Sequence, residues 1–361
     1  MHTMRKGYPS GNPEAFLRSV DLDNKKEEDL QRPFSDIREY SHKGIRFTVK
    51  NHYPSKYRTY QNEQGEQVIY PHLLMVHGVA SDASYFDAFG TNMARLGIAS
   101  SAIELPRFTS GVWNGDKLLN WQVGAAAHTG ELLKETTRAD SDIIYVGHSR
   151  GAIVATKATR ALYDNEFYRP KGLILLAPAG IDKIADGKLY KGVPLLGPLV
   201  LNNLISGFQE GNRLIPNTTM LGRVILRNIP QTLIEVKQAM NEVITELFEE
   251  MPEIDILIPF AEDDEFIKYV ELYKVALKYP NVSVVTVESS HMLDNPRYKD
   301  VISLADPRLL TGQVLAYEQA QIKNYSPITI HAASGTYCRT SNFNLQKHMA
   351  QLASQSEHGV S

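Results

Sequence analysis

Apolar residues in this chain gather into short runs that alternate with segments of helical spacing. Residues 73–76 (LLMV), 142–149 (DIIYVGHS) and 172–180 (GLILLAPAG) each contain a continuous apolar run, as expected of strands buried on both faces. Two later runs, 254–264 and 282–291, have the same character and are separated by a helix-like segment. Strands that alternate with helices predict an α/β fold with a mainly parallel sheet covered by helices on both faces.

The segments between these runs supply the remaining predicted elements. Residues 36–53 alternate around Lys43-Gly44 and predict two antiparallel strands joined by a tight turn. Residues 98–106 predict a short strand, and residues 151–162 a helix. A further helix is predicted from a capping residue, Ser81 or Asp82, and an apolar stripe that ends at Gly97; the stripe consists of Tyr85, Phe86, Phe89, Met93 and Leu96.

One interruption of this alternation divides the chain. Residues 181–251 carry no strand signal, and an amphipathic helix is predicted there from Leu233, Val236, Met240, Val243 and Leu247. We interpret this block as a helical cap inserted into a core of residues 35–180 and 252–323; a second independent domain is the alternative. Residues 1–34 are expected to form an N-terminal extension, and residues 324–361 a loosely attached polar C-terminal tail after a predicted helix at 306–322.

Composition narrows the class of protein. The formal net charge of −3 gives no electrostatic case for a nucleic-acid partner. A single cysteine, Cys338, excludes an intramolecular disulfide and fits a reducing, cytoplasmic location best. The N-terminus lacks the apolar run of a secretory signal, and the stretch 193–208 is too short and too interrupted for a transmembrane segment. Zinc, P-loop and dinucleotide motifs are absent, so neither a metal nor another cofactor is expected.

The candidate chemistry begins at Gly147-His148-Ser149-Arg150-Gly151, where a predicted strand turns into a predicted helix. This sequence fits the Gly-x-Ser-x-Gly pattern of a nucleophile elbow. A sharp turn of this kind holds the serine in a strained backbone conformation, and glycines two residues before and after it prevent steric collisions. The following helix directs its positive N-terminal end toward the serine, where it favours a developing negative charge.

With this nucleophile elbow between a predicted strand and a predicted helix, residues 36–298 resemble the α/β-hydrolase superfamily. The resemblance implies a triad in the order Ser149, Asp264, His291, because the acid and the histidine follow the last two predicted strands, in AEDDEFI and ESSHML. Asp263 is the alternative acid, and Asp182 a more distant one. All of these positions lie just past strand ends, where sites gather in parallel sheets.

The same resemblance implies an oxyanion hole. His77-Gly78-Val79 is similar to the His-Gly-x loop, and the backbone N–H groups of Val79 and Arg150 would bind the oxygen that becomes negative. His77 itself is expected to support the loop. The Arg150 side chain is expected to lie over the surface beside the elbow, with a substrate clamp as the alternative. Substrate-pocket candidates are His77, Phe108 and Trp113.

These features predict a serine hydrolase that cleaves a carboxylic ester, expected to be a small molecule with a hydrophobic acyl or aromatic group. A thioester, amide, peptide or carbon–carbon bond is an alternative substrate for the same triad, and a non-catalytic binding protein with this fold is the alternative from another class. The apolar residues of 193–208 also allow transient contact between the cap and a lipid surface.

Overall fold

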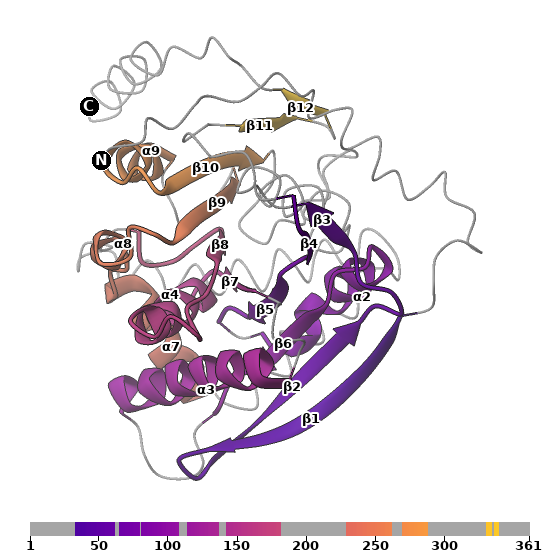
Figure 1. Ribbon diagram of the computed structural model, residues 1–361. Coiled ribbons are helices and arrows are strands. Elements are labelled where there is room, and N and C mark those ends of the chain that lie inside the picture. The colour runs from indigo at the N-terminus through magenta and orange to yellow at the C-terminus, as the bar shows by residue number, and fades with distance from the viewer. Residues whose placement is uncertain are drawn as a thin grey trace, which may run out of the picture.

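A ten-stranded mixed sheet forms the centre of the molecule (Figure 1). The computed structural model describes residues 33–61, 65–79, 81–107, 114–136, 142–181, 229–261, 269–287, 330–333 and 336–338. In sheet order the strands are β1 (Phe34–His42), β2 (Ile45–Tyr53), β6 (Ser100–Glu104), β5 (His72–Val76), β7 (Ile143–His148), β8 (Gly172–Leu176), β9 (Asp255–Ala261), β10 (Val282–Val287), β11 (Ile330–Ala333) and β12 (Thr336–Cys338). Strands β3 (Thr59–Gln61) and β4 (Gln67–Ile69) form a separate antiparallel pair.

In sheet order, the seven strands from β6 to β11, which include β5, are parallel. β2 joins β6 antiparallel, and the hairpin of β1 and β2 forms one edge of the sheet. Because parallel strands end at the same edge, the segments that follow β5, β7, β8, β9 and β10 all leave the sheet on one side. The expected fold class is therefore confirmed, and its functional residues are expected at this edge.

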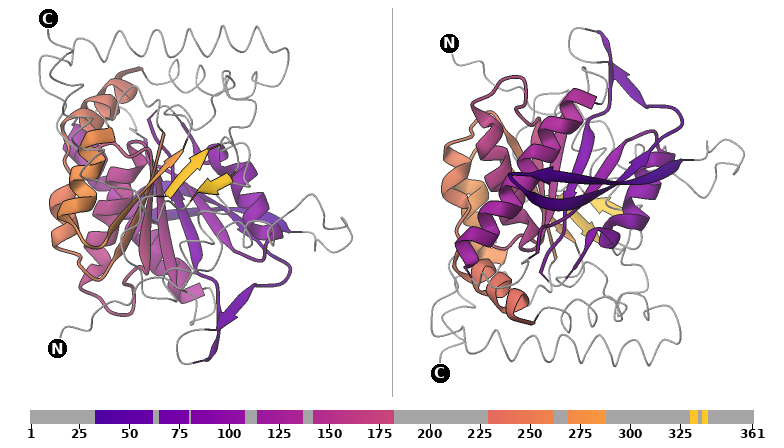
Figure 2. Two further views of the ribbon diagram at one scale, coloured as in Figure 1. Left: turned by 90° about the horizontal axis from the view of Figure 1, so that it is seen from above. Right: turned by 90° about the horizontal axis from the view of Figure 1, so that it is seen from below.

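Helices cover both faces of the sheet (Figure 2). One face carries α3 (Gly115–Thr136), α4 (Gly151–Tyr163), α8 (Thr245–Glu249) and α9 (Tyr269–Lys278), whose apolar residues form one core with alternate strand residues. The other face carries the short helix η2 (Ala83–Phe86) and α2 (Asp87–Arg95). Helix α7 (Ile229–Asn241) contacts α3. The central strands are thus buried on both faces, which explains their continuous apolar runs.

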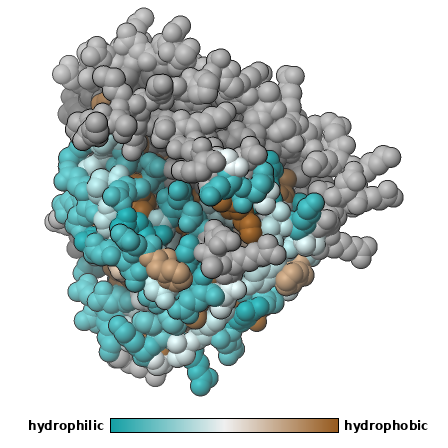
Figure 3. Space-filling model, viewed as in Figure 1, coloured by the Kyte–Doolittle hydropathy of each residue, from teal (hydrophilic) through white to brown (hydrophobic). Residues whose placement is uncertain are grey.

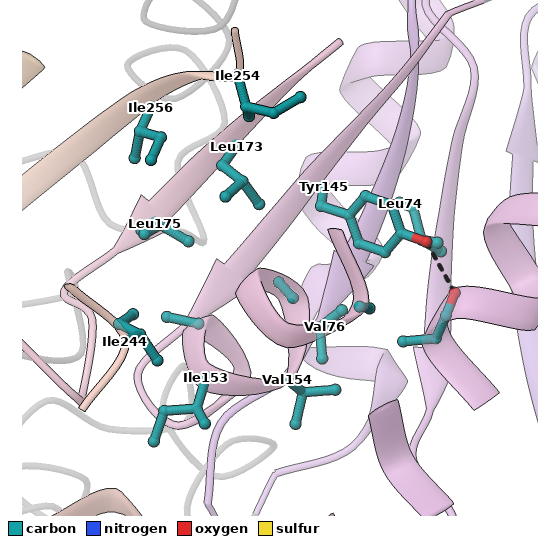
Figure 4. Packing of buried hydrophobic residues seen from close by; sticks show 14 of the residues in the cluster. Leu74, Val76, Tyr145, Ile153, Val154, Leu173, Leu175, Ile244, Ile254 and Ile256 are labelled. Carbon is teal, nitrogen blue, oxygen red and sulfur yellow. Dashed lines mark hydrogen bonds between the residues drawn. The ribbon is translucent and has the colours of Figure 1, made fainter. Parts of the chain in front are cut away.

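Side chains on successive strand residues enter different cores. Leu74 and Val76 of β5 pack in the first core, whereas Leu73 and Met75 pack in the second. Figure 4 shows the first core, where Tyr145 lies beside Leu74 and donates its hydroxyl to the Ala126 carbonyl at 2.9 Å. Burial raises the pKa of the Tyr145 hydroxyl, so this group stays protonated and remains a donor.

The tight turn that Lys43-Gly44 predicted is present between β1 and β2. Lys43 and Gly44 have φ angles of 51° and 79°, so both central residues are left-handed, as in a type I′ turn. Nine residues of each strand then pair in register from Phe34 and Tyr53 to His42 and Ile45. The short helix η2 begins after the predicted capping residue Asp82, whose carboxylate accepts a hydrogen bond from the Ser84 N–H. Helix α2 continues from η2 at Asp87 and is followed by Gly97 with φ 85°.

Three features were not predicted from the sequence. Helix α3 is the longest described helix, yet its Ala- and Gly-rich segment lacks a strong apolar stripe. The small β3–β4 pair has no apolar signal. Strands β11 and β12 lie in residues 330–338, within the expected C-terminal tail, and extend the sheet beyond β10. Backbone N–H and C=O groups at a sheet edge accept another strand whatever its side-chain pattern, which explains why these strands were missed.

The described residues on the face seen in Figure 3 are mainly hydrophilic, with apolar residues in isolated spots. Five large apolar side chains of the described residues are exposed: Phe34, Ile37, Phe167, Leu233 and Leu277. No described helix combines the length and the apolar character that crossing a bilayer requires.

Candidate active site

Ser149 occupies the turn between β7 and α4 in a conformation that side chains rarely adopt. Its φ angle is 51°, in the left-handed region, although it is not glycine. The turn is held on both sides: the Ser149 N–H donates to the Leu176 carbonyl at 2.9 Å, and the Ser149 carbonyl accepts from the N–H groups of Ala152 and Ala179. Neighbouring backbone therefore maintains this strain, as expected at a functional site.

The two glycines of the elbow allow this turn to close. A Cβ atom at Gly147 would lie 2.6 Å from the Ala152 Cα, and one at Gly151 would lie 2.6 Å from the His77 carbonyl oxygen and closer still to that of Val76. All of these neighbours belong to the backbone, which cannot move aside cheaply. The steric reason inferred from the motif is thus met at both positions.

The segment after β5 lies directly beside the serine. A Cβ atom at Gly78 would lie 3.1 Å from the Ser149 Cβ and 3.2 Å from the His148 carbonyl oxygen. Val79, the next residue, is half-buried. Arg150 is the N-cap residue of α4, and the first N–H groups of a helix lack acceptors within it. The loop backbone at Gly78 and the start of α4 at Arg150 thus both lie next to Ser149.

The His77 side chain supports the loop that contains it. Its Nε2 atom accepts a hydrogen bond from the Leu105 N–H at 3.3 Å, so Nδ1 carries the proton and donates to the Gly78 carbonyl at 2.9 Å. Both ring nitrogens are therefore engaged with backbone groups. The ring also forms part of the wall of a small surface hollow, described below.

His148, the residue before the serine, packs away from the turn. Its ring stacks on Tyr85 with a centroid distance of 4.8 Å, and its Nε2 atom lies 3.3 Å from the Tyr85 hydroxyl oxygen. The ring is buried. This contact joins the elbow to η2 on the second face of the sheet.

The position of the Arg150 side chain corrects the sequence-based expectation. It was expected over the surface beside the elbow, but it is 0% exposed and is the largest fully buried side chain described. Its Nη2 atom donates to Oε1 of Gln122 and of Gln238, both at 2.5 Å, and its Nε atom donates to Gln238 at 3.1 Å. Polar partners on α3 and α7 explain how the guanidinium can be buried.

Helix α7 buries several polar side chains beside part of the predicted apolar stripe. Gln231, Thr232, Glu235 and Gln238 are buried together with Met240 of the predicted stripe, whereas Leu233, which begins that stripe, is 44% exposed. Glu235 forms an ion pair with Arg150, with its Oε1 atom 3.7 Å from Nη1, and accepts hydrogen bonds from Gln122 and Gln231. A buried guanidinium selects the polar face because it must be matched by acceptors and a negative charge.

Burial lowers the pKa of the Arg150 guanidinium, and the negative charges of Glu235 and Glu242 oppose this effect. An arginine remains protonated even so, and the pair carries no net charge. The residues of this network were missed because a glutamine or glutamate on a helix has no distinct sequence signal until its partner is known.

The hollow at this end of the sheet lies between the His77 loop and α7. It is lined by His77, Ser81, Leu105, Arg107, Gln231, Thr232 and Glu235. These residues come from the segments after β5 and β6 and from α7. Among the described residues, no cluster of three or more His, Cys, Asp or Glu side chains could hold a metal ion.

Comparison with solved structures identifies the fold of this chain, whereas comparison of its sequence finds no relative. No protein-family model matches this chain, and no curated protein matches it in sequence. Solved structures do match: an alpha/beta hydrolase enzyme from a Medee basin deep-sea metagenome library has a TM-score of 0.53 at 12% identity, covering 78% of this chain and 97% of its own. The chain has the α/β-hydrolase fold.

Two further solved structures support the same fold. A thermophilic esterase matches with a TM-score of 0.52 at 15% identity, covering 80% of this chain and 99% of its own. A membrane phospholipase A, described as a bacterial virulence factor, matches with a TM-score of 0.53 at 16% identity, covering 87% of this chain and 93% of its own. At these identities the comparisons establish the fold, and they confirm that part of the sequence resemblance.

Within the α/β-hydrolase fold, the remaining candidates follow strands that the structure describes. β9 ends at Ala261, shortly before Asp264, and β10 ends at Val287, shortly before His291. Both strands run parallel to β7, with β8 between β7 and β9. Their carboxyl ends therefore point to the edge that carries Ser149. Outside the described residues lie the candidates Asp264, His291, Asp263, Asp182, Phe108 and Trp113, and the segment 182–228 of the expected cap.

Proposed function

We propose that this protein is a serine hydrolase that cleaves a carboxylic ester through an acyl-enzyme. The observation that carries the proposal is the strained Ser149 at the strand-to-helix turn, enclosed by backbone at Gly147 and Gly151 and flanked by the His77-Gly78-Val79 loop. Such strain is retained where the surrounding structure over-determines it, commonly at functional sites. The solved esterase and phospholipase A structures share the fold and so are consistent with this class of reaction.

In the proposed mechanism, the Ser149 oxygen attacks the ester carbonyl while His291 takes its proton. The carbonyl oxygen becomes negative and is bound by the N–H groups of Val79 and Arg150. His291 then gives the proton to the leaving alcohol, and the acyl group remains on Ser149. A water molecule, deprotonated by His291, releases the acid and restores the serine. Asp264 holds the histidine tautomer and stabilises its charged form, with Asp263 as the alternative acid.

The acyl half of the substrate is proposed to be hydrophobic or aromatic, on the basis of Phe108, Trp113 and the apolar content of residues 193–208. A thioester, an amide or peptide, and a carbon–carbon bond are cleaved by related chemistry on the same serine.

The test is labelling of the full chain with a fluorophosphonate, followed by peptide mapping and by turnover of p-nitrophenyl esters from acetate to laurate. We expect one adduct, on Ser149, and turnover that Ser149→Ala removes. Ser84→Ala is the matched control, because Ser84 is an exposed serine on η2 and should retain both adduct and turnover. His291→Ala should lose the adduct, since the serine is no longer deprotonated.

Two results would contradict the proposal. Full ester turnover in Ser149→Ala would show that another residue performs the reaction. A folded wild-type protein that forms no adduct and hydrolyses no ester, thioester or amide, yet binds such compounds, would favour a non-catalytic binding protein with this fold.

A further inference from the structure

The peptide group that joins Ser149 to Arg150 carries one of the proposed oxyanion donors, the Arg150 N–H. Its carbonyl oxygen, which belongs to Ser149, accepts hydrogen bonds from the N–H groups of Ala152 and Ala179 at 3.0 and 3.1 Å. In a trans peptide group the N–H points away from the carbonyl oxygen, and this group is trans. The two bonds therefore restrict the direction of the N–H from one end of the group.

The other end of this peptide group is the Arg150 Cα, which the Arg150 side chain anchors. This side chain is fully buried. Its Nη2 atom donates to Oε1 of Gln122 and of Gln238, and its Nε atom donates to Gln238 at 3.1 Å. The residue enters α4 with φ −59° and ψ −27°, while its guanidinium is fixed at the far end. Arg150 thus connects the elbow to two further helices, α3 and α7.

The two glutamine acceptors are themselves held by backbone groups. The Nε2 atom of Gln122 donates to the Pro106 carbonyl at 3.0 Å, and that of Gln238 donates to the Gly115 carbonyl. An amide whose nitrogen is bound in this way presents its oxygen on the other side, where the guanidinium lies. The anchor for Arg150 is therefore a set of preoriented acceptors rather than two freely rotating side chains.

Stability alone does not account for an arginine at this position. Replacing a buried ion pair with apolar side chains of similar volume is often neutral or stabilising, because both charges lose their hydration on burial. Arg150 and Glu235 are 0% and 8% exposed, and Nη1 of Arg150 lacks a hydrogen-bond partner among the described residues. What an arginine adds over an apolar side chain is a planar set of donors with fixed directions. Such a group is suited to hold the backbone beside Ser149 in one orientation.

We propose that the Arg150 side chain is a positioning residue for the oxyanion hole: by anchoring its own Cα to α3 and α7, it orients its own backbone N–H beside Ser149. This inference rests on the proposed ester hydrolysis. The guanidinium does not contact the substrate in this arrangement. Because an oxyanion donor acts mainly where the carbonyl oxygen becomes negative, a displaced N–H should lower kcat and leave KM nearly unchanged.

A second attachment holds the end of α7 when the Arg150 anchor is removed. The Ile244 N–H donates to the Gly180 carbonyl at 2.8 Å, and Lys157 on α4 pairs with Glu242 at 2.6 Å. Ile244 is also fully buried in the first core. The fold around the elbow is therefore expected to survive variants of the network, so that their activity can be measured.

The main variant combines Arg150→Met with Glu235→Gln, which removes the guanidinium without leaving a buried charge and keeps the N–H of residue 150. With p-nitrophenyl butyrate as substrate, we expect kcat to fall about ten-fold or more while KM changes less than about two-fold. Gln238→Met removes one acceptor and keeps the ion pair, so it should lower kcat less. Arg160→Met is the matched control, because Arg160 is also in α4 but is partly exposed and paired with exposed carboxylates; its kcat should not change.

Three measurements separate positioning from a general loss of stability. Tyr145→Phe removes a buried hydrogen bond outside the network, so it should lower the melting temperature but not kcat. A trifluoromethyl ketone forms a tetrahedral adduct with a negative oxygen on an active serine, and the double variant should bind it more weakly by about the factor by which kcat/KM falls. The pH dependence of kcat should not move, because the double variant leaves the net charge unchanged.

Three results would overturn the inference. One is unchanged kcat in the folded double variant, or in Gln238→Met if the double variant does not fold. Another is an equal fall in kcat for Tyr145→Phe at the same melting temperature, which would indicate stability alone. The third is a shifted pH profile with unchanged affinity for the trifluoromethyl ketone, which would indicate an effect of charge on the catalytic histidine.

The wild type separates these outcomes from a failure of the proposed function. In each of the three cases, fluorophosphonate labelling of Ser149 and ester turnover in the wild type leave the proposed ester hydrolysis standing. A wild type with neither labelling nor turnover would instead contradict that function itself.

Discussion

Arg150, the N-cap residue of α4, and Glu235 in α7 form an ion pair inside the molecule, although they lie 85 positions apart in the chain. Their side chains are 0% and 8% exposed, and Nη1 lies 3.7 Å from Oε1. The distance is long for a hydrogen bond, and among the described residues Nη1 has no hydrogen-bond partner. The pair therefore acts chiefly by balancing charge, and each residue is needed for the other to be buried.

Breaking this pair should destabilise the fold strongly. Glu235→Gln leaves a buried guanidinium without its carboxylate, and we expect a loss of about 3–5 kcal/mol in the free energy of unfolding. Arg150→Met together with Glu235→Gln should cost clearly less than the sum of the two single variants. Urea denaturation of all four proteins in the double-mutant cycle measures this. Costs that simply add would show that the two charges are not coupled.

The elbow glycines should not accept even one methyl group. Gly151→Ala would place its Cβ against the carbonyl oxygens of Val76 and His77, so we expect destabilisation of about 1–3 kcal/mol together with lost labelling of Ser149. Gly124→Ala is the matched control within α3, because its Cβ would meet only the His42 side chain at an ordinary 3.4 Å. That change should stabilise the protein by up to about 1 kcal/mol. Equal thermal shifts for the two variants would contradict this steric account.

Acid should destabilise the fold through His72. Burial lowers the pKa of this side chain to about 3, from 6.5 in the unfolded chain. Its Nε2 atom lies 2.8 Å from the Ser101 hydroxyl oxygen, which in turn donates to Asn51. As the pH falls from 6.5 toward 3, the unfolded chain binds a proton at this position and the folded protein does not. His72 should therefore subtract about 1.4 kcal/mol of stability per pH unit in this window, and nothing above it.

The measurement for His72 is the free energy of unfolding between pH 7.5 and 4.5, in the wild type and in His72→Gln. Burial also lowers the pKa values of His52 and His42, so part of the slope will remain. The variant should show a slope smaller by one proton, whatever its stability at pH 7.5. Parallel curves would mean that His72 is not the responsible group.

The hairpin turn offers a stabilising substitution. Lys43 adopts a φ of 51° with a side chain that disfavours it, whereas asparagine and glycine tolerate this region. Lys43→Gly or Lys43→Asn should therefore raise the free energy of unfolding by about 1 kcal/mol or less, and with it the melting temperature. Gly44→Ala should lower it, because φ is 79° there, even though a Cβ would meet no atom. A rise in the melting temperature with Gly44→Ala would refute this account of the turn.

The sequence alone determined those features whose cause is local. Continuous apolar runs specified the central strands, because a strand buried on both faces must be apolar at every position. Gly147 and Gly151 marked the elbow, because a Cβ at Gly147 would meet the backbone of Gly151 and Ala152, and one at Gly151 would meet the backbone at the end of β5. Lys43-Gly44 specified the hairpin turn in the same way. Each of these signals can be read within about ten residues.

Tertiary structure alone decided which polar groups meet. Nothing near Arg150 in the chain shows that its side chain is buried, because its acceptors lie on α3 and α7, far away in sequence. The same contact explains why α7 buries Gln231, Glu235 and Gln238 in addition to Met240, since a buried guanidinium must be matched by acceptors and a negative charge. Strand β11 joined the edge of the sheet through backbone pairing, which side-chain patterns do not record. Long-range partners and backbone edges were decided by the fold, whereas strands and turns were already specified by the local sequence.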